Sequence, residues 1–275
     1  MPEIRLEHIT KRWGKFYGVD DLNLVIENNA FVTLLGPSGC GKTTTLRMIA
    51  GLETPTSGRI TIGDTVVFDS ELGINIPANK RKVGFLFQNP DRQLCRTTVR
   101  EELLFGLRLH VRDEAEAARR LERALADFAL DPEENPLTAA RAERQRIALA
   151  SVVALGPRLL VLDEPTTGLS FAECRRTMEI VRRLHREGTT VVLISHDMEL
   201  ILRYAERMLV LAGGTLRADG APHDVLRRAD VLAEAALLPP EIVQVASALG
   251  EPFAGLDTDA ALARALIEAR ASAAG

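Results

Sequence analysis

The residues with the clearest chemistry lie between Phe31 and Thr45, in the run FVTLLGPSGCGKTTT. Gly36, Gly41, Lys42 and Thr43 fit the phosphate-loop pattern G-x-x-x-x-G-K-[ST]. Glycines let backbone N–H groups converge on a phosphate, and the N-terminus of the helix that follows faces the same anion. We expect Lys42 to reach the β- and γ-phosphates and the Thr43 hydroxyl to hold Mg²⁺. The alternative, a plain strand–turn–helix corner, is disfavoured by the strand and helix predicted on either side.

Other polar side chains follow predicted strands. Asp163 and Glu164 end an apolar run, whereas Gln88 and His196 each follow a further strand-like segment. Because ligands of parallel α/β sheets bind at the carboxyl ends of strands, we expect all four beside the phosphate loop. Asp163 is expected to bind Mg²⁺, Glu164 to polarise an attacking water, and His196 to sense the γ-phosphate. An acid pair that caps a helix, or a structural histidine, explains each residue alone but not all together.

The elements that must position these residues follow from hydrophobic periodicity. Alternating segments at 4–9, 22–26 and 58–63 predict half-buried strands, and apolar segments at 31–35, 83–87, 159–162 and 190–194 predict buried ones. Helical periodicity begins at Thr97 and includes a charged helix at 113–128, is broken by Pro132 and Pro136, and resumes at 141–155. A further helix is predicted at 172–186. Trp13 lies in an aromatic turn and is our candidate platform for an adenine ring, with Phe16 or Tyr17 as alternatives.

Composition places the 275-residue chain among ordinary globular proteins. It is 46% hydrophobic and 26% charged, and its net charge of −4 gives no support for a nucleic-acid-binding surface. The run Lys80-Arg81-Lys82 is interpreted as a solvated loop edge. Three cysteines without metal-like spacing suit reduced thiols. We find no signal peptide and no apolar run long enough to span a membrane, so we expect another chain to supply any membrane part.

These motifs together resemble the ATP-binding-cassette (ABC) ATPases. Gly36–Thr44 resembles the Walker A motif, Leu159–Asp163 the Walker B motif, Gln88 the Q-loop glutamine and His196 the switch histidine. The resemblance implies ATP and Mg²⁺ as cofactors, with Lys42, Glu164 and His196 in catalysis and Thr43, Gln88 and Asp163 at the metal. The implied nucleotide-binding set is Trp13, Gly36, Pro37, Ser38, Gly39, Cys40, Gly41, Lys42, Thr43, Thr44, Gln88 and Asp163.

The resemblance also implies a fold and its division into domains. The expected class is α/β: a phosphate-loop core with a parallel sheet, an antiparallel β subdomain and an inserted α-helical subdomain. We expect the ABC ATPase domain at residues 1–227, with the helical subdomain inserted at about 89–157. Residues 228–275 are Ala/Leu-rich and are expected to form a helical C-terminal extension.

Shorter segments narrow the resemblance. VGFLFQNPDRQL at residues 83–94, and the segments at 98–107 and 237–250, are similar to ATPases of energy-coupling-factor and cobalt/nickel-type importers. This similarity implies an ATPase subunit that energises import of a vitamin or metal ion from the cytoplasmic face of the membrane. The implied partners are a second ABC ATPase subunit, a transmembrane coupling protein and a substrate-binding membrane subunit, with no nucleic acid.

Two motifs depart from the family pattern. Residues 139–143, AARAE, occupy the place of the signature LSGGQ; a second register at 137–141 needs two inserted residues. Ser170 replaces the D-loop aspartate. In the family both motifs face the partner subunit, and the signature contacts the partner's γ-phosphate. A homodimer would then have two impaired sites, so we favour an asymmetric heterodimer; in the alternative, Arg141 substitutes for the signature and the dimer is symmetric.

Two rival functions remain open at this point. One is a soluble, non-transport ABC ATPase in DNA repair or translation, against which stand the single cassette, the acidic charge and the lack of a coiled-coil insertion. The other is an unrelated phosphate-loop kinase, which needs an acceptor site and leaves the segment from Gln88 to Leu94 unexplained.

Overall fold

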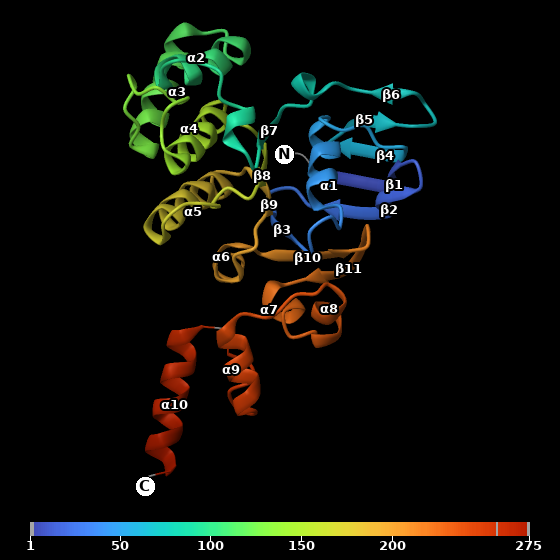
Figure 1. The fold of residues 1–275 in the computed structure, drawn as a ribbon, viewed down its shortest axis with the longest axis vertical. Helices are drawn as coiled ribbons and strands as arrows, with labels where there is room; N and C mark the ends of the chain where they lie inside the picture. The colour runs from blue at the N-terminus through green and yellow to red at the C-terminus, as the bar shows by residue number, and fades with distance from the viewer. Residues whose placement is uncertain (1–2, 257, 274–275) are drawn as a thin grey trace.

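The computed structural model of the chain describes residues 3–256 and 258–273. Its centre is a six-stranded sheet in the order β11-β10-β3-β9-β8-β7 (Figure 1). The strands are β3 (Phe31–Leu35), β7 (Val83–Leu86), β8 (Leu159–Asp163), β9 (Thr190–Ile194), β10 (Arg207–Ala212) and β11 (Thr215–Gly220). All neighbouring pairs are parallel except β10–β11, which is antiparallel. Every residue of β3, β8 and β9 is buried, and each strand is apolar except for one residue: Thr33, Asp163 and Thr190.

A second sheet of five strands is antiparallel, in the order β2-β1-β4-β5-β6. Its strands are β1 (Ile4–Trp13), β2 (Phe16–Ile26), β4 (Ser57–Ile62), β5 (Thr65–Asp69) and β6 (Ile74–Asn75). Figure 1 shows this sheet on one side of the central sheet, with helix α1 (Lys42–Ala50) between them. Apolar side chains of both sheets and of α1 form one continuous core cluster. The phosphate-loop helix is therefore held between two sheets.

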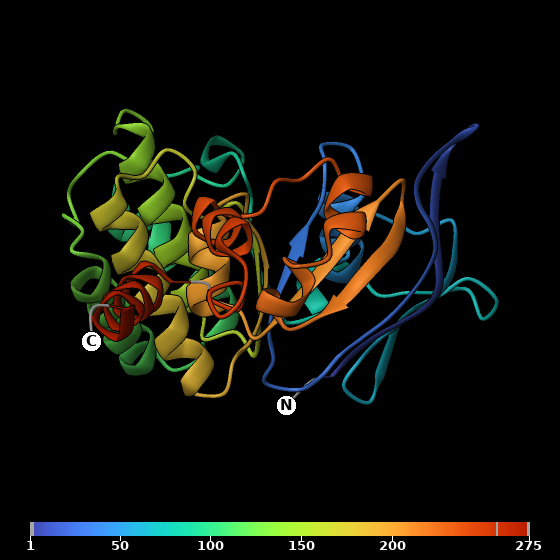
Figure 2. The same ribbon diagram turned by 90° about the horizontal axis from the view of Figure 1, so that it is seen from below.

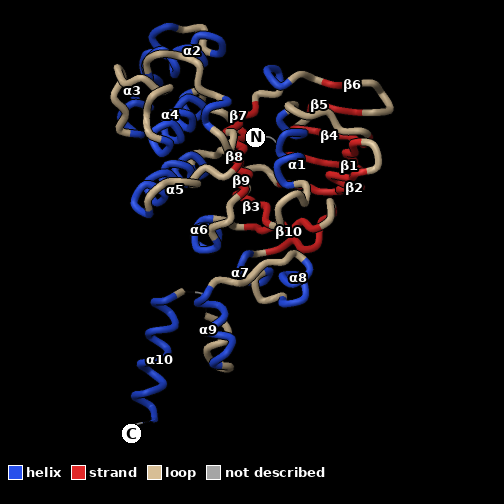
Figure 3. The backbone as a smooth tube through the Cα atoms, viewed as in Figure 1, coloured by secondary structure: helices blue, strands red, loops and turns tan. Residues whose placement is uncertain are grey.

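Helices cover the other side. Helices α2 (Val99–His110), α3 (Glu114–Phe128) and α4 (Arg141–Ala154) form a block that packs with α5 (Phe171–Arg186) against the central sheet. Short 3-10 turns at Ala78–Lys80 and Pro90–Arg92 flank β7. Figure 3 shows that the chain leaves the sheet after β7, forms the helical block, and returns to the sheet at β8, the strand paired with β7. Gln88 and Asp163 thus lie at the same sheet edge despite the intervening block.

The C-terminal part is helical. It comprises α6 (Met198–Tyr204), α7 (Pro222–Val225), α8 (Ala229–Glu234), α9 (Glu241–Leu249) and α10 (Asp259–Ala273). Helices α7 and α8 pack on β10 and α6 in a third apolar cluster. Figures 1 and 2 show α9 and α10 side by side, extending away from the central sheet. Among the described residues no helix is both long and apolar enough to cross a membrane.

One interpretation of the sequence is wrong for one of its three residues. Lys80 and Lys82 are exposed, as expected for a solvated loop edge, but Arg81 is only 5% exposed. Its guanidinium donates hydrogen bonds to the carbonyls of Met48 (2.7 Å) and Ile49 (3.1 Å) at the end of α1. It also donates to Ile76 O (2.7 Å), to Val67 O and to the side chain of Asn75. Arg81 therefore joins α1 to the antiparallel sheet, and burial lowers the pKa of its guanidinium to about 10.

The observed elements otherwise follow the predicted ones, with two kinds of difference. Strand β1 continues to Trp13 and strand β2 begins at Phe16, so the predicted aromatic turn is the tip of a long hairpin. The seven-residue helix α6 and the two-residue strand β6 were not predicted. The expected fold class, an α/β core with an antiparallel sheet and a block of helices, is confirmed.

Candidate active site

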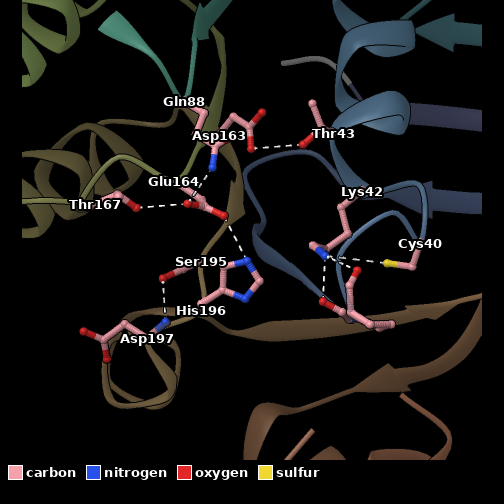
Figure 4. Close-up of polar contacts among 12 residues, drawn as sticks. Cys40, Lys42, Thr43, Gln88, Asp163, Glu164, Thr167, Ser195, His196 and Asp197 are labelled. Carbon is pink, nitrogen blue, oxygen red and sulfur yellow. Dashed lines mark hydrogen bonds and ion pairs between the residues drawn. The ribbon is translucent and has the colours of Figure 1, made fainter. Parts of the chain in front are cut away.

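The phosphate loop joins β3 to α1, and its lysine lies inside the loop. Lys42 Nζ donates to the carbonyl oxygens of Gly36 (2.6 Å) and Pro37 (2.8 Å) and lies 3.6 Å from Cys40 Sγ (Figure 4). Lys42 is buried, with 7% of its surface exposed. An ammonium group held by carbonyl oxygens has exchangeable partners, so an anionic phosphate can take their place.

Two glycines of the loop are required by close backbone approach. A Cβ atom on Gly36 would lie 2.1 Å from Leu211 O, and one on Gly41 would lie 2.3 Å from Gly18 O. Gly41 also has φ of 101° at the N-cap of α1. These contacts tie the loop to β10 and to the hairpin of β1 and β2, so its shape is set by tertiary packing as well as by its own sequence.

Thr43 and Asp163 meet at the edge of the pocket. Thr43 Oγ1 lies 3.3 Å from Asp163 Oδ1, although the residues come from α1 and β8. Asp163 is 3% exposed, and burial raises the pKa of its carboxyl, with the neighbouring charge of Glu164 adding to the effect. A buried carboxylate beside a hydroxyl is a donor set that suits Mg²⁺, which needs few protein ligands when phosphates and waters complete its shell. The residues present therefore fit the ion.

Glu164 lies at the centre of a small polar cluster. Its Oε1 is 2.9 Å from His196 Nε2, and its Oε2 accepts hydrogen bonds from Gln88 Nε2 (2.9 Å) and Thr167 Oγ1 (3.0 Å) (Figure 4). The Gln88 amide is thus directed at Glu164, and no hydrogen bond between it and Thr43 or Asp163 is found in the described part of the chain. The expectation that Gln88 binds the metal stays a prediction.

The backbone of Glu164 separates it from Asp163. Its φ is 52°, in the left-handed region that residues other than glycine seldom adopt. Its N–H donates to Ile194 O on β9 at 3.0 Å. This conformation turns the chain at the end of β8, so that two consecutive carboxylates face different partners: Thr43 for Asp163, and His196 for Glu164. The two carboxylates therefore have separate surroundings.

Aromatic side chains form the other end of the pocket. Trp13 and Phe16 are stacked with their centroids 6.2 Å apart and are 47% and 61% exposed. Trp13 lies against Gly18, where a Cβ would be 2.5 Å from its Cζ3 atom. Lys11 Nζ lies 5.2 Å from the Trp13 ring centroid. Exposed aromatic faces beside a phosphate loop suit the stacking of a base.

These parts line one cavity of about 330 Å³. Of the predicted site residues, it brings together Trp13, Ser38, Gly39, Gly41, Lys42, Thr43, Thr44, Gln88, Glu164 and His196. Gly36, Pro37, Cys40 and Asp163 are linked to it through Lys42 and Thr43. The sequence analysis did not select two residues of this site, Gly18 and Thr167. The position of Gly18 beside the aromatic turn could have indicated that it packs against Trp13, whereas a threonine in a turn carries no such information.

The segments that depart from the family pattern lie at two helix starts. Helix α4 begins at Arg141, and its N-cap residue Ala140 makes no side-chain hydrogen bond to the helix. Arg141 is exposed, and its Cδ and Nε atoms lie 3.7 Å from the place of a Cβ on Gly168. Ser170 caps α5: its hydroxyl donates to Glu173 Oε2 at 2.7 Å.

Comparison with known proteins adds to this geometry. The family described as ABC transporter matches residues 19–167. The putative ABC transporter ATP-binding protein TTE1589 of Caldanaerobacter subterraneus is 37% identical over 87% of this chain, which spans 42% of that protein's length. The energy-coupling factor transporter ATP-binding protein EcfA2 of Clostridium tetani is 35% identical over 85% of this chain and 82% of its own length. EcfA2 of Geobacillus kaustophilus is 36% identical over similar shares, 85% and 82%.

Solved structures agree with this similarity. A dimeric ATP-binding cassette in a post-hydrolysis state bound to ADP and Pi has a TM-score of 0.71 and 26% identity. It matches 80% of this chain and 98% of its own. The structure of cbiO1 from Clostridium perfringens, part of the ABC transporter complex cbiONQ, has a TM-score of 0.72 and 25% identity, over 88% and 97% of the chains.

Proposed function

Because the chain belongs to the ABC transporter family, whose cassettes bind and hydrolyse ATP to drive transport, we propose that it is the ATPase subunit of an energy-coupling-factor-type importer of a vitamin or metal ion. The observation that carries the proposal is the convergence of Lys42, Thr43, Glu164 and His196 on one cavity that has aromatic rings at its far end. Relatives named as energy-coupling factor ATP-binding proteins, matched over 82% of their length, support the subgroup.

The chemistry follows from what each side chain can do. Lys42 and the N-terminus of α1 neutralise the phosphates of ATP, and Trp13 stacks on its base. Glu164 accepts a proton from the attacking water, and His196, 2.9 Å from Glu164, holds that water and the γ-phosphate in line. Thr43 and Asp163 would hold Mg²⁺, which would supply charge neutralisation for the phosphates when bound. Gln88 keeps the Glu164 carboxylate oriented through its 2.9 Å hydrogen bond.

A groove beside Gln88 is proposed to receive the transmembrane coupling protein. It has a volume of about 320 Å³ and lies between α1, β7, α2 and α4, with Phe85, Phe87 and Phe105 among its apolar lining. Gln93 Nε2 donates to Ala148 O at 2.7 Å and so fixes the segment after Gln88 to α4. A partner segment seated there would press on the backbone next to Gln88. The chain would thus work at the cytoplasmic face of a membrane, alongside a substrate-binding membrane subunit.

The second ATPase subunit is proposed to differ from this chain. At the signature, Ala140 lacks a hydroxyl and Arg141 adds a long cationic side chain where the family has glycine. At the D-loop, the Ser170 hydroxyl is engaged in its own helix cap. Both changed segments lie outside the cavity that contains Lys42 and Glu164. A partner with an intact signature would complete the site on this chain, and the site that depends on Arg141 would be weak.

The test is ATP hydrolysis by the purified chain, alone and mixed with a candidate cassette that carries an intact signature. We expect strong hydrolysis only in the mixture, and its loss when this chain carries Glu164→Gln. Restoring the motif in this chain with Ala140→Ser and Arg141→Gly should raise the activity of the chain alone. Hydrolysis at a normal rate by the unmixed wild-type chain would exclude the heterodimer, and absence of hydrolysis in every mixture would exclude the ATPase assignment.

A further inference from the structure

The general base proposed above is held by a residue that the family resemblance does not assign. Thr167 Oγ1 donates a 3.0 Å hydrogen bond to Glu164 Oε2, the oxygen that also accepts from Gln88. We propose that Thr167 is a positioning residue for hydrolysis, which keeps the Glu164 carboxylate directed at the attacking water. This inference rests on the proposed ATPase function.

The three partners of Glu164 come from three different segments. Gln88 follows β7, His196 follows β9, and Thr167 belongs to the turn that Glu164 itself begins (Figure 4). The Thr167 N–H also faces Glu164 O, at 3.4 Å. Thr167 lies three residues from Glu164 in the same turn, whereas Gln88 and His196 reach the carboxylate from segments distant in the sequence. Thr167 is therefore the partner whose position is set most directly by the local backbone of Glu164.

The turn that carries Thr167 is itself fixed. Leu169 N donates to Thr166 O at 3.1 Å, and the buried Cys174 thiol lies 3.7 Å from the carbonyls of Thr166 and Leu169. At its end, Ser170 and Glu173 form a reciprocal capping box at the start of α5. The hydroxyl of Thr167 is thus presented from a segment tied to a long helix, which is what holding a catalytic carboxylate requires.

The left-handed backbone of Glu164 makes such a restraint useful. With φ of 52°, the residue leaves β8 at a sharp turn, and its side chain lines the cavity. A glutamate side chain has three rotatable bonds, so its carboxylate samples several directions unless hydrogen bonds select one. Thr167 and Gln88 on one oxygen and His196 on the other select a single orientation.

The first arm of the test measures single-turnover ATP hydrolysis by the full chain with its ATPase partner. Thr167→Val keeps the shape and removes the donor, and we expect the rate constant to fall about tenfold, which corresponds to about 1.4 kcal/mol. The dissociation constant for ATP should stay within about twofold, and Thr167→Ser should restore the rate. Thr166→Val is the matched control, because in the described part of the chain the Thr166 hydroxyl makes no hydrogen bond. Equal rates for wild type and Thr167→Val, or no rescue by serine, would overturn the inference.

The second arm does not depend on hydrolysis. Crystal structures of the wild type and Thr167→Val without nucleotide should differ at Glu164, whose carboxylate is expected to lose its joint contact with Gln88 and His196 in the variant. An unchanged Glu164 would overturn the positioning role. A wild type that fails to hydrolyse ATP would instead count against the proposed function, and the crystallographic comparison would still decide the role of Thr167.

Discussion

His196 Nε2 lies 2.9 Å from Glu164 Oε1, and each residue follows a different strand of the parallel sheet. The distance is that of a hydrogen bond between imidazole and carboxylate. Strands β8 and β9 are paired from Leu159–Thr190 to Asp163–Ile194, which fixes how far apart these two side chains begin. The pairing of β8 with β9 therefore brings the two side chains together, and substitution of either residue tests their role.

Replacing the proposed base should separate binding from hydrolysis. For Glu164→Gln we expect hydrolysis to fall by about 100-fold or more, since general-base catalysis contributes about 10² to 10⁴. ATP affinity should change little, because Lys42, Thr43 and Trp13 remain. Steady-state kinetics and nucleotide titration measure the two effects. Glu199→Gln, an exposed acid in the first turn of α6, is the control and should behave as wild type. Loss of ATP binding in Glu164→Gln would contradict this division of labour.

The ionised Asp163 carboxylate should lower the free energy of unfolding when no metal is bound. Burial raises the pKa of its carboxyl above the ordinary 3.8, so the folded state holds the proton more tightly than the unfolded state. The ionised group therefore lowers the free energy of unfolding at neutral pH, and Asp163→Asn should raise the melting temperature by about 2 °C. The difference should shrink as the pH is lowered toward 3.8, where the wild type regains its proton.

The same variant should lose the stabilisation that Mg²⁺ with ATP gives the wild type, which thermal melts with and without ligand would measure. A variant that is less stable than wild type without ligand at pH 7 would contradict the stated effect of burial.

Trp13 provides a direct signal for nucleotide binding. It is the single tryptophan of the sequence, and its ring is 47% exposed beside the cavity. A base stacked on it should change the intrinsic fluorescence on addition of ATP, whereas Trp13→Phe removes that signal and keeps an aromatic face. Gly18→Ala should raise the KM for ATP by about tenfold, because its new methyl group occupies the place of the Trp13 ring. Normal nucleotide affinity in Gly18→Ala would show that the base does not use Trp13.

Arg81 should be a stability hot spot. Arg81→Met leaves the carbonyls of Met48, Ile49 and Ile76 without their donor, and we expect a loss of about 3 kcal/mol in the free energy of unfolding. Urea denaturation measures the effect. Lys80→Met, one residue earlier and exposed, is the matched control and should change stability by about 0.5 kcal/mol or less. Equal midpoints for the two variants would contradict the structural role assigned to Arg81.

Local sequence predicts the elements around the phosphate loop well. The apolar run that ends at Gly36 and the helix that follows Gly41 have the predicted bounds, because glycines interrupt both patterns. The residues after β7, β8 and β9 were expected at one sheet edge, and Gln88, Glu164 and His196 do line one cavity. Here each element is long enough, or apolar enough, for its pattern to be decisive.

What the sequence misses depends on distant partners. Arg81 has a charged run on both sides, and its burial follows from carbonyls of α1 and β5 that no local pattern reveals. Helix α6 is seven residues long, too short for a helical period to emerge. Thr167 lies in a turn where threonine is ordinary, and only the left-handed conformation of Glu164 brings the two side chains together.

Strands β7 and β8 are hydrogen-bonded neighbours, and three helices lie between them in the chain. The chain thus leaves the sheet after β7 and returns to it in the adjacent strand β8. A segment attached in this way can change its length and surface without altering the pairing of the strands that carry the chemistry. The strand pairing that carries Gln88 and Glu164 is therefore independent of the length of the inserted helices, so the two parts of the chain can differ in sequence without disturbing each other.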